Sequence, residues 1–137
     1  MRTLARYLVL TKYDEGVSAP PMAEWDPEDI TALLEYLRAL NQRLIESGEL
    51  VEGLALTGPE LAKVVVSDGS GPPVITDGPF PEVKEVLAGF QMIDVESEDR
   101  AVEIAALVSA APGPGGVPMG QRIELRQVMG TLPGTDL

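Results

Sequence analysis

The sequence predicts an α+β domain whose strands and helices follow a ferredoxin-like order. Short β-type patterns and two amphipathic helical patterns occur in the order strand, helix, two or three strands, helix, strand. This is the split βαβ arrangement, here with an extra hairpin. Because 137 residues is a common size for one core, we expect a single domain over residues 1–129 and a flexible tail at 130–137.

The first strand and the first helix are predicted within residues 4–46. Residues 4–11 are rich in apolar and β-forming side chains, which favours a strand. Asp26 and Pro27 are typical of a helix N-cap and first turn, and Gly48 is typical of a helix end. The apolar residues between them recur at the spacing of one helical face. This face consists of Ile30, Leu33, Leu34, Leu37, Leu40, Leu44 and Ile45.

Three extended segments are predicted after this helix. They span residues 49–56, 61–66 and 73–76, and turn sequences at 58–59 and 68–71 separate them. We therefore expect them to pair as antiparallel hairpins. Residues 81–86 are expected to form a helical turn, and residues 89–95 another strand.

A second helix and a last strand complete the predicted domain. Ser97 is expected to cap a helix that runs to Ala110. The last strand, at 121–128, alternates Ile123 and Leu125 with charged residues, so one of its faces should be buried. Because two helices can cover only one face of the sheet, we expect a second copy of the chain to cover the other face in a homodimer.

The composition excludes several classes of function. A net charge of −12 repels a phosphate backbone, so no nucleic acid partner is expected. The chain has no cysteine and no histidine, which removes thiolate chemistry and the commonest metal ligand and general base. No metal or cofactor is expected. There is neither a signal-peptide pattern nor an apolar stretch of the roughly 20 residues that span a bilayer, so we expect a cytoplasmic protein without a membrane partner.

Residues 74–95 contain the most specific motif of the chain. They join an apolar strand, Asp77-Gly78-Pro79-Phe80, the pair Lys84-Glu85, Gly89-Phe90 and Ile93-Asp94-Val95. In this order and spacing they resemble the signature of the DGPF branch of the YCII-related family. The resemblance implies a ferredoxin-like protomer that pairs into a dimeric α+β barrel. The wider family includes proteins with a proposed His-Asp acid/base pair, which a chain without histidine cannot contain.

The loop Asp77-Gly78-Pro79-Phe80 has two interpretations. In the structural one, Asp77 stabilises a turn, Gly78 supplies backbone freedom, Pro79 makes the turn rigid and Phe80 anchors it in the core. In the functional one, the turn holds the Asp77 carboxylate in a cleft at the edge of the sheet, where it could act as a general base. Both interpretations can hold together.

Three further side chains are candidate ligand-binding residues near Asp77. Lys84 could pair with Asp77 or bind an anionic ligand, and the alternative is a surface ion pair. Arg126 could bind a carboxylate, or pair with Glu124 or with the partner subunit. Tyr7 could donate its hydroxyl into the same pocket, or be a half-buried strand residue.

Two hypotheses on function follow from these residues. In the first, the dimer binds a small anionic or carbonyl-bearing organic molecule in a cleft bordered by Asp77, Lys84, Arg126 and Tyr7, and Asp77 could act there as a base. In the second, the protein is a non-catalytic homodimeric regulatory or protein-interaction module. The Asp77–Phe80 loop is then structural, and the acidic surface recognises another protein.

Overall fold

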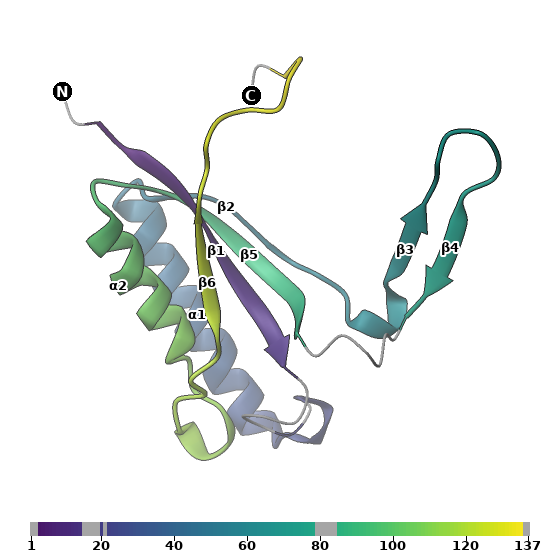
Figure 1. The fold of residues 1–137 in the computed structure, drawn as a ribbon. Coiled ribbons are helices and arrows are strands. Elements are labelled where there is room, and N and C mark those ends of the chain that lie inside the picture. The colour runs from purple at the N-terminus through teal and green to yellow at the C-terminus, as the bar shows by residue number, and fades with distance from the viewer. Residues whose placement is uncertain (1–2, 15–19, 21, 79–84, 136–137) are drawn as a thin grey trace.

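The computed structural model describes residues 3–14, 20, 22–78 and 85–135 and confirms the predicted α+β, ferredoxin-like class (Figure 1). Short 3-10 turns lie at η1 (Met22–Glu24), η2 (Pro59–Leu61) and η3 (Pro114–Gly116). The strands and helices are β1 (Ala5–Asp14), α1 (Pro27–Glu46), β2 (Leu50–Ala55), β3 (Lys63–Val66), β4 (Val74–Asp77), β5 (Glu85–Val95), α2 (Glu98–Ser109) and β6 (Ile123–Gln127).

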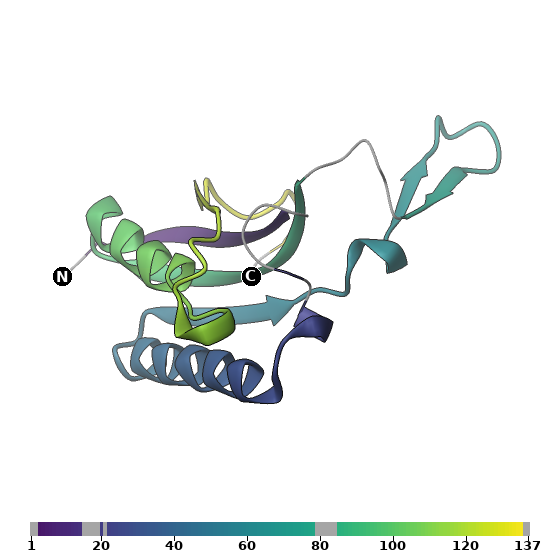
Figure 2. The same cartoon turned by 90° about the horizontal axis from the view of Figure 1, so that it is seen from below.

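The main sheet is antiparallel and has the strand order β2-β5-β1-β6. The prediction that three consecutive segments pair with one another is therefore wrong for β2, which pairs with β5 instead. Only β3 and β4 form a hairpin, and this hairpin is a separate two-stranded sheet. It stands away from the rest of the molecule in both ribbon views (Figure 1 and Figure 2).

The strand β5 begins earlier than its sequence pattern indicates. Glu85 and Val86 pair with the end of β1, so they are extended and not part of a helical turn. The reason is the length of β1, whose ten residues offer hydrogen-bonding partners beyond Gly89. The rest of the predicted turn, residues 81–84, lies outside the described residues.

Both helices pack on one face of the main sheet and form the core with it. The Tyr36 hydroxyl on α1 donates a hydrogen bond to the Leu107 carbonyl on α2 at 2.7 Å, which links the two helices. The core residues combine apolar side chains of the sheet and of both helices. They are Tyr7, Val9, Leu40, Leu44, Ile93, Val95, Ala101, Ile104, Ala105 and Val108.

The two helix starts differ in how they are capped. The Ser97 hydroxyl accepts a hydrogen bond from the Arg100 backbone N–H, as predicted for an N-cap. Asp26 occupies the N-cap position of α1, but its side chain makes no capping hydrogen bond. At the end of α1, Gly48 has a φ of +79°, the left-handed conformation that ends many helices.

The apolar face of α1 is only partly buried. Leu33, Leu40 and Leu44 are buried, whereas Leu34 and Ile45 are about half exposed, at 50% and 56%. They lie at one margin of the predicted face, so the structure buries a narrower stripe of α1 than the pattern predicts.

Candidate functional site

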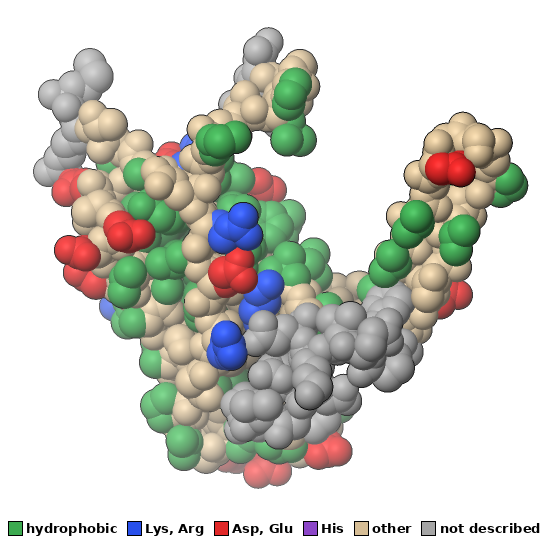
Figure 3. Space-filling view, viewed as in Figure 1, with side chains coloured by type: hydrophobic (Ala, Val, Ile, Leu, Met, Phe, Trp, Pro, Cys, Tyr) green, Lys and Arg blue, Asp and Glu red, His purple; other side chains and the backbone are tan. Residues whose placement is uncertain are grey.

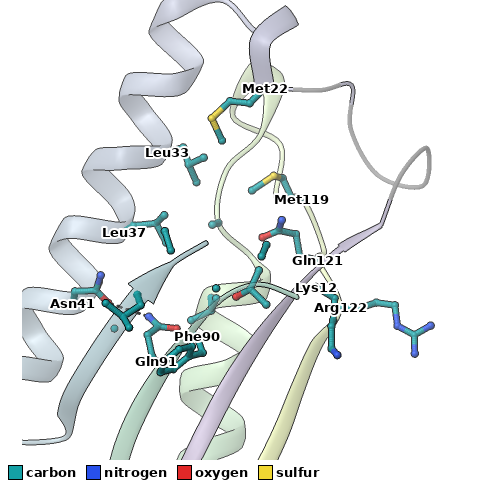
Figure 4. A pocket seen from close by; sticks show the side chains of 18 of the residues that line it. Lys12, Met22, Leu33, Leu37, Asn41, Phe90, Gln91, Met119, Gln121 and Arg122 are labelled. Atoms are coloured by element: carbon teal, nitrogen blue, oxygen red, sulfur yellow. Dashed lines mark hydrogen bonds between the residues drawn. The ribbon is translucent and has the colours of Figure 1, made fainter. Parts of the chain in front are cut away.

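A cavity of about 670 Å³ lies between α1 and the main sheet (Figure 4). Its walls come from α1, from η1, from the ends of β1, β2 and β5 and from the chain between α2 and β6. Most of the lining is apolar, and the cavity is partly open to solvent. The apolar side chains around it include Met22, Trp25, Leu33, Leu37 and Met119.

The cavity exists because the sheet bears small residues beneath one end of α1. At the packed end, Leu50 and Tyr7 both lie opposite Ile93, and these bulky side chains fill the space under the helices. At the other end, Ala55 and Thr11 both lie opposite Gly89. A row of small side chains cannot reach the helix, so a hollow remains.

Gly89 is required here by the close approach of two strands. A Cβ atom at this position would lie 2.7 Å from the Leu54 carbonyl oxygen, closer than real Cβ atoms approach. The register of β1 against β5 also shifts beside it, between Thr11 and Lys12. The irregular pairing and the absent side chain together shape the floor of the cavity.

Trp25 forms the wall at the η1 end. Its ring packs with Leu33 and Ala111, and its indole N–H donates to the Pro20 carbonyl at 2.8 Å. Met119 packs against the same group and is held by a hydrogen bond from its backbone N–H to the Ala111 carbonyl, at 2.9 Å. The loop after α2 is therefore pinned by its backbone and contributes a fixed side of the cavity.

Three side-chain amides line the cavity, those of Asn41, Gln91 and Gln121, and the first two face each other. Gln91 Nε2 on β5 donates to Asn41 Oδ1 on α1, at 3.0 Å. Figure 4 shows the pair beneath Leu37, between the helix and the strand. No Asp or Glu is among the described residues that line the cavity.

The two cations of the lining point away from its apolar part. In Figure 4 the ends of Lys12, on β1, and of Arg122, just before β6, extend on the side away from α1. Lys12 Nζ lies 3.6 Å from the Glu124 carboxylate. The pKa of Glu124 is lowered, first by a hydrogen bond from Arg126 and then by the charge of Lys12. In Figure 3, basic side chains (blue) with one acidic side chain (red) among them form a column along β6.

Asp77, the predicted base, lies at the end of β4, on the hairpin. Its side chain is 71% exposed, and its carboxylate pairs with Lys63 Nζ at 2.6 Å. The Gly78 backbone N–H donates to the Ala62 carbonyl at 2.8 Å, which closes the base of the hairpin. Exposure and the local ion pair favour the structural interpretation of this carboxylate. Pro79, Phe80 and Lys84 lie outside the described residues.

Tyr7 and Arg126 lie on opposite faces of the main sheet. The residue opposite Tyr7 on β6 is Gln127, whereas Arg126 lies opposite Leu8. Tyr7 is buried under the helices at 7% exposure, and Arg126 is 70% exposed on the other face, where it donates to Glu124 at 3.2 Å. Within one copy of the chain, the structure therefore does not bring Asp77, Tyr7 and Arg126 to one cavity.

Sequence reasoning does not find the cavity residues. Asn41 lies four residues after Leu37 and three before Leu44, so it is a polar residue within the apolar face of the helix pattern, and Gln91 likewise interrupts an apolar strand. These two interruptions are signals, but the sequence does not show that they face each other. The glycines at 53 and 89 are further signals, because glycine within a strand often marks a bulge or a close approach. Among the described residues, no three acidic side chains form a group that could hold a metal ion.

The split βαβ sheet with two helices on one face places the chain among ferredoxin-like α+β proteins. The YCII-related domain family model matches residues 5–117, so the chain belongs to the YCII-related family. An uncharacterized protein of Rhizobium meliloti (strain 1021) is 34% identical over 110 residues, which cover 80% of this chain and 85% of that protein. The predicted family is confirmed. No helix in the described ranges is long and apolar enough to cross a membrane.

Proposed function

We propose that the protein binds a small, mostly apolar organic molecule with a carbonyl or anionic group in the cavity between α1 and the sheet. The observation that supports this is an apolar hollow of about 670 Å³ with a few convergent polar side chains. Sites for small molecules typically measure roughly 300–1,000 Å³ and have this composition. The apolar portion of the ligand would contact Trp25, Leu33 and Leu37, and its polar group would meet Asn41 and Gln91.

We propose that the cavity binds this molecule, and we assign no catalytic reaction to it. The described lining contains no carboxylate, and the chain has no histidine or cysteine, so carboxylate, imidazole and thiolate bases or nucleophiles are absent from it. The role of Asp77 as a base stays a prediction. It would require a ligand to reach the exposed hairpin, where Asp77 is paired with Lys63.

The single tryptophan provides a direct test, because Trp25 lies in the cavity wall. We would titrate the protein with 2-acetylnaphthalene and with 2-naphthoate, a neutral carbonyl probe and an anionic one, and follow the indole N–H of Trp25 by NMR. At least one probe should shift this signal in a saturable manner. Unchanged cavity signals with both probes would contradict the proposal.

A matched pair of glycine substitutions locates the binding. A Cβ at Gly53 would lie 3.5 Å from Gln91 Cγ, an ordinary contact, so Gly53→Leu should occupy the cavity floor without distorting the strand. Gly71 lies in the hairpin turn, where a Cβ would meet no atom within 4 Å, and Gly71→Leu is the control. We expect weaker probe binding only in the Gly53 variant.

We also propose that the protein acts as a homodimer through the uncovered face of the main sheet. Leu54 and Leu10 both lie opposite Phe90, and Leu8 lies opposite Met92, so these five side chains form an apolar patch over two adjacent rows. Glu52 and Arg126 lie at the two ends of the Met92 row. The Arg6–Asp94 pair, at 2.7 Å, and the Lys12–Glu124 pair border these rows. An apolar patch with balanced charges at its rim suits a two-fold related copy.

Sedimentation equilibrium of two lysine variants tests this interface. Leu54 on the uncovered face and Val102 on α2 are equally exposed, at 52% each. Leu54→Lys should shift the protein toward monomer, and Val102→Lys should not. A wild-type protein that sediments as a monomer at micromolar concentration would contradict the homodimer.

The alternative function, a protein-interaction module, is supported by the β3–β4 hairpin. Val65 and Ile75 form one exposed apolar pair of the ladder, and Val66 and Val74 form the next, on the other face. Green side chains line the projecting hairpin in Figure 3. If the hairpin captures a different protein, Val65→Lys should abolish that capture and leave both probe binding and sedimentation unchanged.

A further inference from the structure

The amide pair Asn41 and Gln91 is the most specific chemical feature of the cavity. Their hydrogen bond, Gln91 Nε2 to Asn41 Oδ1 at 3.0 Å, links α1 to β5. Both side chains line the cavity, next to the apolar group around Leu37 (Figure 4). This hydrogen bond determines which donor and acceptor groups of the two amides remain free for a ligand.

Each side-chain amide has one carbonyl oxygen and one NH₂ group. With the bond as described, the NH₂ of Asn41 and the carbonyl of Gln91 remain for a ligand. If both amides were turned over, the carbonyl of Asn41 and the NH₂ of Gln91 would remain instead. The bonded NH₂ keeps one more N–H and the bonded carbonyl one more lone pair, but in either orientation the pair offers one unused NH₂ beside one unused carbonyl. Neither residue has a second side-chain partner in the described part of the chain.

The surroundings of this pair favour a neutral ligand group. A carboxylate presents acceptors only, so one of its oxygens would face the acceptor of the pair. Lys12, a cation of the lining, lies by Glu124 on the far side of β1 from α1. An ester or ketone has no N–H to donate, and would leave the acceptor of the pair without a partner.

We propose that Asn41 and Gln91 determine specificity for a neutral carboxamide or lactam, whose adjacent C=O and N–H complement the pair. The ligand would place this group between α1 and β5 and its apolar part against Leu33, Leu37 and Trp25. This inference depends on the proposed binding in the cavity. It adds the functional group that the cavity selects.

Three isosteric probes test the selection. Naphthalene-2-carboxamide, 2-naphthoate and 2-acetylnaphthalene differ only in the polar group, and their affinities would be measured by the same NMR titration. The wild-type protein should bind the carboxamide about tenfold more tightly than either of the others, the effect of a well-formed hydrogen bond. Equal affinities, or a preference for 2-naphthoate, would overturn the selection while leaving the cavity as a binding site. Absence of binding by all three would overturn both proposals.

The variant for this test must remove both amides, because either one alone still has a donor and an acceptor. In Asn41→Leu/Gln91→Met, the carboxamide should bind within about twofold of 2-acetylnaphthalene, whose binding persists, while 2-naphthoate should gain no advantage because its charge stays uncompensated. Gln42→Leu, on the exposed surface of α1, is the control and should keep the wild-type preference. Preference for the carboxamide in the double variant would overturn the assignment.

A measurement on the wild-type protein keeps the inference testable if the double variant does not fold. In the carboxamide complex, nuclear Overhauser effects should connect the NH₂ protons of the probe with the side-chain NH₂ protons of Asn41 or Gln91. Effects between the probe NH₂ and Met22 or Met119 alone would place the amide at the opposite end of the cavity and overturn the proposal.

Discussion

Arg100 donates to both carboxylate oxygens of Glu49, from Nε at 2.8 Å and from Nη2 at 2.9 Å. Arg100 lies in the first turn of α2, and Glu49 lies between α1 and β2. The pair therefore fastens the start of one helix to the connection that follows the other. The Glu49 side chain is only 17% exposed, so solvent screens this pair less than the other ion pairs of the surface.

This pair predicts an acid-dependent loss of stability. The hydrogen bonds from Arg100 lower the pKa of Glu49, and partial burial opposes them less strongly. A lowered folded-state pKa stabilises the protein above the unfolded-state value of about 4.3 and ceases to do so as the pH falls through the folded-state value. The free energy of unfolding should therefore fall below about pH 4.3, as measured by urea denaturation across pH.

The variant Glu49→Gln isolates this contribution. It should be less stable than the wild type near neutral pH, by about 1–2 kcal/mol, and the difference should shrink as the pH falls. Glu98→Gln, an exposed acid in the first turn of α2, is the control for general charge effects. A constant difference between wild type and Glu49→Gln from neutral to acid pH would contradict the assigned role.

The two sheet glycines beside the cavity predict substitutions of opposite effect. Gly89→Ala places a Cβ 2.7 Å from the Leu54 backbone carbonyl, which cannot rotate away, and should cost about 1–3 kcal/mol. Gly53→Ala places its Cβ 3.5 Å from a flexible side chain. It should be neutral or stabilising by up to about 1 kcal/mol, because alanine restricts the unfolded chain. Thermal unfolding of both proteins measures the contrast, and equal effects would contradict the close approach of β2 and β5.

Most helices and strands, and the fold class, can be predicted from the sequence because they depend on local patterns. Neighbouring residues set the periodicity along α1 and the Ser97 cap, and the structure confirms both predictions. The pairing of β2 with β5 does not follow from the sequence, because a strand pattern does not specify its partner when another strand follows closely. The residues of β5 that pair with β2, 89–93, fall within the predicted strand, but no local pattern indicates that β2 is their partner.

The residues of the candidate site cannot be predicted from the sequence either, because their positions depend on how the strands are aligned. Tyr7 and Arg126 both belong to strands of one sheet, which suggests a shared pocket, yet the register places them on opposite faces. A shift by one residue would reverse this result, and no local pattern determines it. The cavity depends on small residues of separate strands that align under α1, which is a property of the register as well.

The two helix N-caps predict unequal effects of alanine. Ser97→Ala removes the acceptor for the Arg100 backbone N–H, at 3.1 Å, and should cost about 1 kcal/mol. Asp26→Ala removes a side chain without a capping hydrogen bond, so only its favourable interaction with the helix dipole is lost, at most about 0.5 kcal/mol. Equal losses in chemical denaturation would indicate that Asp26 caps α1 in solution.

The last prediction concerns Asp77 and its place on a separate two-stranded sheet. Its partner Lys63 is 62% exposed, so Asp77→Asn should change the global free energy of unfolding by less than about 1 kcal/mol. The effect should appear locally, because β3 and β4 pair only with each other and can open without the main sheet. Amide hydrogen exchange at Val64–Val66 should accelerate in Asp77→Asn and stay unchanged in Ile93–Val95. A large global loss of stability would instead show that the Asp77 turn is anchored in the main core.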